Sequence, residues 1–343
     1  MKPMKIAEFV IDDAHEVFVI AEVGINHNGQ LSLAKEMAMA AKEAGASCVK
    51  FQTHIVDKEM IHTDMPPGKI SAEPLWDIIK RCSLSAAEER ELKEYCDRIG
   101  ILFLSTPFSR EAADQLEKLN VPAFKIGSGE LTTLPLIEHI ARKGKPLILS
   151  TGMAEWHEIA ETADLLRQLD VPFALLQCTS SYPSRYEEVR LGAIPIMKQL
   201  FGVPVGLSDH SPDAYTAIGA VAVGALIVEK HITLDRKLPG PDQGFSIEPS
   251  ELRELVRGVR AVKAAMRSDR AIQDVERPVM QFARASVVAI RDIPAGEALS
   301  LDNVWVKRPG TGAIPARDFR RVLGRRAKVS LRYDHQLNWN EIE

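Results

Sequence analysis

The chain has 343 residues, of which 45% are hydrophobic and 26% charged, and its formal net charge at pH 7 is −4. This length predicts two domains, or one large domain with an appendage, and a core that needs no disulfide or structural metal. The negative net charge argues against nucleic acid as a partner. Every apolar run is shorter than the roughly 20 residues that span a bilayer, which argues against a membrane protein.

Short apolar runs alternate with helical periodicity through the first 266 residues. We expect eight buried parallel strands, at 17–23, 48–52, 101–105, 123–127, 146–150, 173–178, 203–207 and 226–231. Helices are expected at 31–45, 85–100, 109–120, 132–144, 155–169, 212–225 and 248–266, and a weaker one at 186–199. Ser85 and Glu88 form a capping box, and Gly100 ends that helix. Eight such units match a (β/α)8 barrel. A doubly wound sheet is the alternative, which the missing G-x-G-x-x-G after the first strand disfavours.

The pattern changes after residue 266. Residues 267–284 are interpreted as a linker with little internal structure. Residues 285–343 form a smaller domain with ten Lys and Arg against seven Asp and Glu, strand-like pieces at 286–290 and 327–331, and turns at 294–296 and 309–312. The predicted organisation is therefore a barrel at 1–266, a linker at 267–284 and a small domain at 285–343.

Polar residues fall at the carboxyl end of every predicted barrel strand, where (β/α)8 enzymes build their active sites. Lys50 and Lys125 lie inside apolar runs, where a lone charge is costly. One interpretation is a structural lysine paired with Glu22 or Glu130. A second is a pair of ammonium groups that binds an anion together with nearby Ser, Thr and Gly residues. A Schiff-base lysine is the third.

Two histidines, His210 and His231, end the seventh and eighth predicted strands, which are neighbours in a barrel. Their imidazoles would meet at one divalent cation, and two histidines with open positions suit Mn²⁺, Fe²⁺ or Zn²⁺ better than Mg²⁺. The alternative is a hydrogen-bonded structural histidine or an acid–base group at each position. Asp209 is the expected partner that orients an imidazole.

Nine short motifs, in order along nearly the whole chain, resemble the sialic acid synthase family, which comprises N-acetylneuraminate synthase and related phosphoenolpyruvate-dependent nonulosonic acid synthases. They are EVGINH (22–27), VKFQTH (49–54), LSTPFS (104–109), KIGSGE (125–130), LSTGM (149–153), LSDH (207–210), EKH (229–231), PGPD (239–242) and VKRPG (306–310). The resemblance implies a (β/α)8 TIM barrel followed by a small C-terminal antifreeze-like (SAF) domain. It implies a transferase that condenses phosphoenolpyruvate (PEP) with N-acetylmannosamine, or a related N-acylated hexose, to N-acetylneuraminate plus phosphate. The carbon–carbon bond forms with metal assistance, and PEP loses phosphate by C–O cleavage.

The same resemblance implies a role for each matching residue. The catalytic residues are Glu22, which handles a proton or orients substrate and water, and the metal ligands His210 and His231. The metal is Mn²⁺, with Mg²⁺ or Co²⁺ as alternatives. PEP is bound by Lys50, Thr106, Lys125, Ser128, Ser150, Ser180 and Tyr182. The sugar is bound by Gln52, Phe108, Asp242, Phe282 and Arg308, of which the last two come from the partner chain of a domain-swapped homodimer.

The acceptor sugar stays open at this point. Ser180 stands where some members of the family carry Asn, and the run QGFSIEP at 243–249 is typical of relatives that make legionaminic or pseudaminic acid. A Schiff-base aldolase and a non-enzymatic carbohydrate-binding protein are the remaining classes. The expected partners are the two small-molecule substrates and a second copy of the chain. The cytoplasm is the expected compartment, because the N-terminus is acidic and the four cysteines lack paired spacing.

Overall fold

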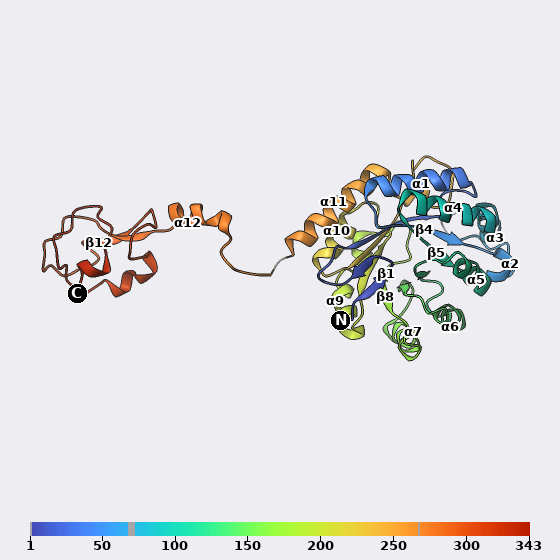
Figure 1. Ribbon diagram of the computed structural model, residues 1–343, viewed down its shortest axis with the longest axis horizontal. Helices are drawn as coiled ribbons and strands as arrows, with labels where there is room; N and C mark the ends of the chain where they lie inside the picture. Colours follow the sequence, from blue (N-terminus) through green and yellow to red (C-terminus); the bar gives the residue numbers. More distant parts are fainter. Residues whose placement is uncertain (1, 68–72, 267) are drawn as a thin grey trace. The chain divides into compact units, whose positions relative to one another are not determined.

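The computed structural model describes residues 2–67, 73–266 and 268–343. The chain divides into two compact units, Met1–Arg267 and Ser268–Glu343 (Figure 1). Residues 1 and 267, which begin the expected barrel domain and the expected linker, lie outside the described part. Every helix of the described residues is too short or too polar to cross a membrane.

Eight parallel strands form the centre of the first unit, as predicted. Their order is β5-β4-β3-β10-β9-β8-β7-β6, and each hydrogen-bonded pair in it is parallel. The two strands at the ends of this order, β5 and β6, also contact each other, so the sheet curves into a nearly closed barrel. The strands are β3 (Phe18–Gly24), β4 (Cys48–Thr53), β5 (Leu102–Pro107), β6 (Phe124–Ile126), β7 (Leu147–Ser150), β8 (Phe173–Cys178), β9 (Val205–Asp209) and β10 (Ile227–His231).

Helices surround the barrel, and α1, α4, α10 and α11 contact one another in this outer layer (Figure 1). The capping box of Ser85 and Glu88 is present at the start of α4, and Gly100 ends that helix in the left-handed conformation. The loop between β4 and α4 holds two short helices that the periodicity did not indicate, α2 and α3. The helices are α1 (Leu31–Ala44), α2 (Val56–Glu59), α3 (Leu75–Cys82), α4 (Ala86–Ile99), α5 (Arg110–Lys118), α6 (Leu134–Ala141), α7 (Trp156–Gln168), α8 (Tyr186–Val189), α9 (Ala193–Phe201), α10 (Tyr215–Ala222) and α11 (Pro249–Ala265).

A short hairpin, β1 (Met4–Ile6) paired with β2 (Phe9–Ile11), closes the amino end of the barrel. Its buried side chains Met4, Ile6 and Ile11 pack in one cluster with apolar residues at the starts of the barrel strands. Burial of this kind contributes roughly 25 cal/mol per Å² of apolar surface. The apolar plug leaves the opposite, carboxyl end of the barrel for polar side chains.

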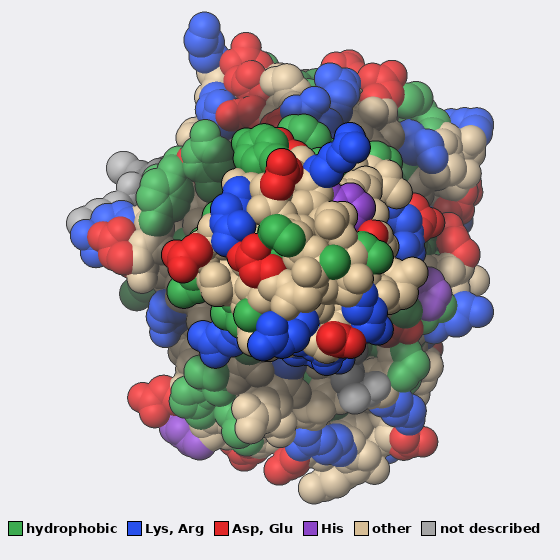
Figure 2. Space-filling model, turned by 90° about the vertical axis from the view of Figure 1, so that its left-hand side faces the viewer, with side chains coloured by type: hydrophobic (Ala, Val, Ile, Leu, Met, Phe, Trp, Pro, Cys, Tyr) green, Lys and Arg blue, Asp and Glu red, His purple; other side chains and the backbone are tan. Residues whose placement is uncertain are grey.

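The second unit is built on two antiparallel strands, β11 (Ser286–Ala289) and β12 (Val304–Lys307), over a small apolar core. The expected strand at 327–331 is wrong, because this segment makes only isolated bridges, such as Ile293 with Leu331. Basic and acidic side chains are interspersed over the face shown in Figure 2, so the basic residues there do not form one continuous surface.

The expected linker contains more structure than its composition indicated. The 3-10 turn η2 (Asp274–Glu276) and the helix α12 (Arg277–Ala283) occupy much of 267–284. Pro278 explains the start of α12, because proline is favoured in the first turn of a helix, where its missing N–H has no partner to lose. Two further 3-10 turns, η3 (Ala316–Arg321) and η4 (Trp339–Glu341), complete the unit.

Candidate active site

A cavity of about 540 Å³ lies at the carboxyl ends of the barrel strands. Parallel strands bring these ends to one rim, and a cavity of this size fits small-molecule substrates. Thirteen of the fifteen predicted site residues line it, namely Glu22, Lys50, Gln52, Thr106, Phe108, Lys125, Ser128, Ser150, Ser180, Tyr182, His210, His231 and Asp242. The other two, Phe282 and Arg308, belong to the second unit.

The two predicted lysines are buried at the floor of the cavity and paired with carboxylates. Lys50 Nζ lies 2.6 Å from Glu22 Oε2 and donates to Thr106 Oγ1 at 3.2 Å. Lys125 Nζ donates to Ser150 Oγ at 2.7 Å and to the Ile126 carbonyl at 3.1 Å. The structure therefore contains the Lys50–Glu22 ion pair that the sequence analysis gave as one interpretation of a buried lysine. The pair lies inside a cavity that is open to a ligand.

Glu229 on β10 is a site residue to which the sequence analysis assigned no role. Its carboxylate lies between the lysines, with Oε2 3.8 Å from Lys50 Nζ and Oε1 3.5 Å from Lys125 Nζ, and Ser208 Oγ donates to Oε1 at 2.9 Å. Strand periodicity was the signal that could have found it, because residues two apart on a strand face the same side. Glu229 therefore faces the cavity together with His231.

Burial and charge act against each other on these groups. Burial raises the pKa of the Glu22 carboxyl to about 7, although the charge of Lys50 opposes it. Burial alone would lower the pKa of Lys50, but the Glu22 and Glu229 carboxylates outweigh burial and raise it. For Lys125, burial prevails over the attraction of Glu229 and lowers the pKa of the ammonium. Glu22 is thus able to gain or lose a proton near neutral pH.

Hydroxyl and amide groups surround the space next to Lys125. Ser128 Oγ accepts a hydrogen bond from the Gly152 amide at 3.0 Å. A Cβ on Gly152 would lie 2.7 Å from Ser128 Oγ, so only glycine lets the chain approach this closely. Among the residues that the structure describes, Ser180 Oγ is one of five buried side-chain atoms without a hydrogen-bond partner. An anionic ligand would supply the missing partner.

The two histidines lie together at the ends of β9 and β10, with ring centroids 5.4 Å apart. His210 Nδ1 donates to the Thr179 carbonyl at 2.8 Å, which leaves Nε2 for a ligand. His231 Nδ1 is buried without a hydrogen-bond partner, 4.0 Å from Asp242 Oδ2. No group of three His, Cys, Asp or Glu side chains with metal-binding geometry occurs within 2–67, 73–266 and 268–343. The residues fit a divalent cation that takes its remaining ligands from water and substrate.

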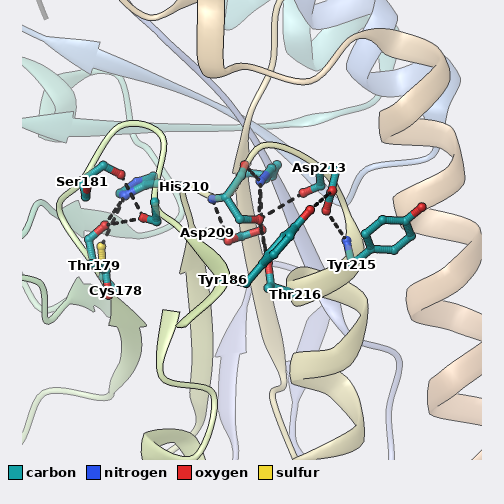
Figure 3. A network of polar contacts seen from close by, with 12 residues as sticks. Cys178, Thr179, Ser181, Tyr186, Asp209, His210, Asp213, Tyr215 and Thr216 are labelled. Atoms are coloured by element: carbon teal, nitrogen blue, oxygen red, sulfur yellow. Dashed lines mark hydrogen bonds and ion pairs between the residues drawn. The ribbon is translucent and has the colours of Figure 1, made fainter. Parts of the chain in front are cut away.

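The expectation that Asp209 orients an imidazole is wrong. Asp209 points to the opposite side of β9 from His210, toward the helices, and accepts hydrogen bonds from Thr216 Oγ1 at 2.9 Å and Lys230 Nζ at 2.9 Å. Figure 3 shows the His210 ring beside Thr179 and Cys178, while Asp209 lies near Thr216. Consecutive strand residues face opposite sides, so the Thr179 carbonyl orients His210 instead.

Aromatic and amide side chains form the upper wall of the cavity. Gln52 Nε2 donates to Glu22 Oε1 at 3.3 Å. Phe108 stacks on His54, with ring centroids 4.2 Å apart, and Tyr182 lies 4.2 Å from the His210 ring. The partly exposed Tyr182 gives this wall a polar edge and an apolar face.

Two family profiles cover most of the chain. The NeuB family profile matches residues 37–271, and the SAF domain profile matches residues 284–343. The chain belongs to the NeuB family. This membership confirms the resemblance to sialic acid and related nonulosonic acid synthases, and it confirms the predicted barrel with a C-terminal SAF domain.

Individual relatives of this NeuB-family chain match it over nearly its full length. An uncharacterized protein of Methanocaldococcus jannaschii is 41% identical over 100% of this chain and 99% of its own. The N,N'-diacetyllegionaminic acid synthase of Legionella pneumophila is 36% identical over 95% of this chain and 94% of its own. The crystal structure of N-acetylneuraminic acid synthetase from Leptospira borgpetersenii, in complex with citrate, matches with a TM-score of 0.74 and 32% identity, over 81% of this chain and 95% of its own.

Proposed function

We propose that this chain condenses PEP with an N-acylated hexose, with N-acetylmannosamine as the first candidate, to give N-acetylneuraminate and phosphate. One observation carries the proposal. Two buried lysines flank one carboxylate at the floor of a cavity whose rim holds two adjacent histidines. PEP is a small polyanion, and a pair of buried ammonium groups suits the binding of such an anion. Family membership supports the same chemistry.

The side chains suggest how the reaction proceeds. Lys50 and Lys125 bind the PEP anion together with Thr106 and the serine hydroxyls near Lys125. The C3 carbon of PEP then attacks the aldehyde carbon of the open-chain sugar, and the aldehyde oxygen takes up a proton. Water adds at C2 of PEP and loses one proton. Phosphate then leaves with the bridging oxygen and takes up the remaining hydroxyl proton as the C2 ketone forms. Glu22, with a pKa of about 7, is the group we assign to proton transfer in this sequence.

His210 and His231 are the residues that would hold the metal, with Mn²⁺ first and Mg²⁺ or Co²⁺ as alternatives. When bound there, the cation acts as a Lewis acid toward the sugar aldehyde. The Thr179 carbonyl holds the His210 ring, and burial keeps His231 available as a neutral imidazole by lowering its pKa.

The other expectations about assembly stay proposals. We propose that Phe282 and Arg308 complete the sugar site of a partner chain in a domain-swapped homodimer. Both side chains are exposed in the second unit, and the planar guanidinium of Arg308 suits hydrogen bonds to hydroxyl and amide oxygens. We also propose the cytoplasm as the compartment, because all four cysteines are free and buried, as reducing conditions favour.

A diacetamido-hexose is the second candidate acceptor, which would make the product a legionaminic or pseudaminic acid. The identity with the Legionella legionaminic acid synthase supports this candidate. The run at 243–249, which is typical of relatives that make such acids, supports it as well. Gln243 Nε2 donates to the Asn26 carbonyl at 2.8 Å and so holds this run next to Asp242.

A substrate panel tests the proposal. The protein is incubated with Mn²⁺, PEP and one of three sugars: N-acetylmannosamine, its 6-phosphate, or a 2,4-diacetamido-hexose. Phosphate release and product mass are measured. We expect phosphate release only with both PEP and a sugar, and the highest kcat/KM identifies the acceptor. Lys125→Met is the matched loss-of-function control. Sugar turnover without PEP, with borohydride trapping of Lys50 or Lys125, would instead indicate a Schiff-base aldolase.

A further inference from the structure

A chain of hydrogen bonds runs along one wall of the cavity, from Glu22 to a second carboxylate, Glu59. Gln52 Nε2 lies 3.3 Å from Glu22 Oε1, and Gln52 Oε1 lies 3.0 Å from His54 Nε2. His54 Nδ1 lies 2.9 and 3.1 Å from the two Glu59 oxygens. Gln52 and His54 are two residues apart at the end of β4, and α2 carries Glu59 back toward the rim. The chain thus connects the proposed proton-transfer residue to a group outside the proposed machinery.

Donor and acceptor counting fixes the protons in this chain. If the Gln52 amide N–H₂ faces the Glu22 carboxylate, the Gln52 oxygen faces His54 and needs a hydrogen from Nε2. A Glu59 carboxylate without a proton likewise only accepts, so it needs a hydrogen from Nδ1. His54 then donates from both ring nitrogens, which makes it an imidazolium. The opposite amide orientation sets the Gln52 oxygen against Glu22, and this arrangement requires a proton on Glu22. The two states therefore differ in where one proton lies: on His54 when the Gln52 N–H₂ faces Glu22, and on Glu22 when the Gln52 oxygen faces it.

The structure has Gln52 Nε2 toward Glu22 and Gln52 Oε1 toward His54, which is the orientation of the state with the charge on His54. The side chains of His54 and Glu59 are only 3% and 4% exposed, so the ion pair is shielded from solvent. The ring also stacks on Phe108, which holds its plane. Among the residues that the structure describes, His27 and Glu130 are titratable groups that interact with this pair. Burial and the charge of His54 lower the pKa of His27 to about 4, so His27 is neutral at pH 7.5. Burial, with a smaller contribution from Glu59, raises the pKa of Glu130 to about 7, so Glu130 still carries part of its negative charge at that pH.

We propose that Glu59 and His54 are positioning residues that act through the Gln52 amide to orient the Glu22 carboxyl group in the resting site. The inference rests on the proposed function only where it concerns turnover. The protonation of His54 and the orientation of Gln52 are properties of the protein alone.

Histidine NMR tests the protonation directly. The full-length protein is labelled with ¹⁵N in its histidine rings, and the His54 signals are assigned by their loss in His54→Gln. At pH 7.5 we expect both His54 nitrogens to be protonated, and Glu59→Gln to convert the ring to a neutral tautomer. A neutral His54 in the natural sequence overturns the inference, whatever the activity of the protein. His157→Gln on the exposed surface of α7 is the matched control, because it removes the two ring-nitrogen signals of His157 and leaves those of His54 unchanged.

A double-mutant cycle tests the positioning role. His54→Gln should lower kcat roughly tenfold with an unchanged KM for PEP, and should have less than a twofold effect in a Gln52→Ala background, since coupled neighbours are not additive. Equal effects in the two backgrounds overturn the inference, because His54 would then act without Gln52. Glu59→Gln serves as the milder variant if His54→Gln fails to fold. Absence of PEP turnover in the natural protein would instead refute the proposed function and leave the NMR result standing.

Discussion

His27 makes the stability of the barrel depend on pH below neutrality. Its side chain is buried, and its Nδ1 accepts a hydrogen bond from the Gly29 amide at 3.2 Å, which a proton on that nitrogen would remove. Burial, with the charge of His54 as a second cause, lowers the pKa of His27 from 6.5 to about 4. When the pKa of a histidine is lower in the folded than in the unfolded chain, its full contribution to the free energy of unfolding is present above the unfolded-state pKa of 6.5. That contribution is lost as the pH falls to about 4.

The expected effect is large enough to measure. The difference between the two pKa values, at roughly 1.4 kcal/mol for each factor of ten, corresponds to about 3 kcal/mol of unfolding free energy. His27→Gln does not titrate, so between pH 7 and pH 4 the natural chain should lose about 3 kcal/mol more stability than this variant. Groups that titrate in both proteins cancel in the comparison.

Urea unfolding at a series of pH values provides the assay. Hydrogen exchange of peptides from β3 and β4 reports on the barrel alone, so the second unit does not enter the result. The exposed variant His157→Gln should follow the natural chain at every pH. Parallel pH profiles for His27→Gln and the natural chain would refute the argument, since they would mean that His27 is protonated equally in the folded and unfolded states.

Four further outcomes are expected. Glu22→Gln should lower kcat about 10²–10⁴-fold while calorimetry still detects PEP binding, and near-normal turnover would leave Glu22 a structural role. Lys230→Met should cost roughly 3–5 kcal/mol in urea unfolding, because Asp209 stays buried without its cation, and adding Asp209→Leu should recover part of the loss. EDTA should abolish turnover and Mn²⁺ restore it, and His210→Ala should weaken Mn²⁺ binding measured by electron paramagnetic resonance. Full activity in metal-free protein would contradict this. Mixing inactive Arg308→Ala and Glu22→Ala chains should partly restore activity if the second unit acts on a partner, and no recovery after confirmed subunit exchange would exclude that arrangement.

The barrel could be predicted from the sequence because its signals are local. Each strand is an apolar run, and the capping box and Gly100 mark both ends of α4 through their own hydrogen bonds and backbone angles. The hairpin β1–β2 was missed because strands of three residues carry almost no periodicity. The second unit was harder for the same reason, since isolated bridges such as Ala327 with Ile342 replace regular ladders there.

The part of the site that could be predicted consists of residues that the strand topology alone brings together. Parallel strands bring Lys50, Lys125 and the two histidine positions to one rim, so a polar residue at a strand end is already a candidate. Contacts that depend on a loop were not predictable. Glu59 reaches His54 only because 56–59 form a short helix after β4, and no periodicity in the sequence indicates that helix. Strand alternation, applied strictly, would have placed Asp209 away from the imidazoles.

The central claim is that the chain joins PEP to an N-acylated hexose with cleavage of the C–O bond of PEP. PEP that carries ¹⁸O in the oxygen between C2 and phosphorus tests it most directly. The protein is incubated with this PEP, Mn²⁺ and the preferred sugar, and mass spectrometry follows the label. The account predicts that all of the label appears in phosphate and none in the nine-carbon keto acid. Label retained in the keto acid, or a keto acid formed without phosphate, would contradict it.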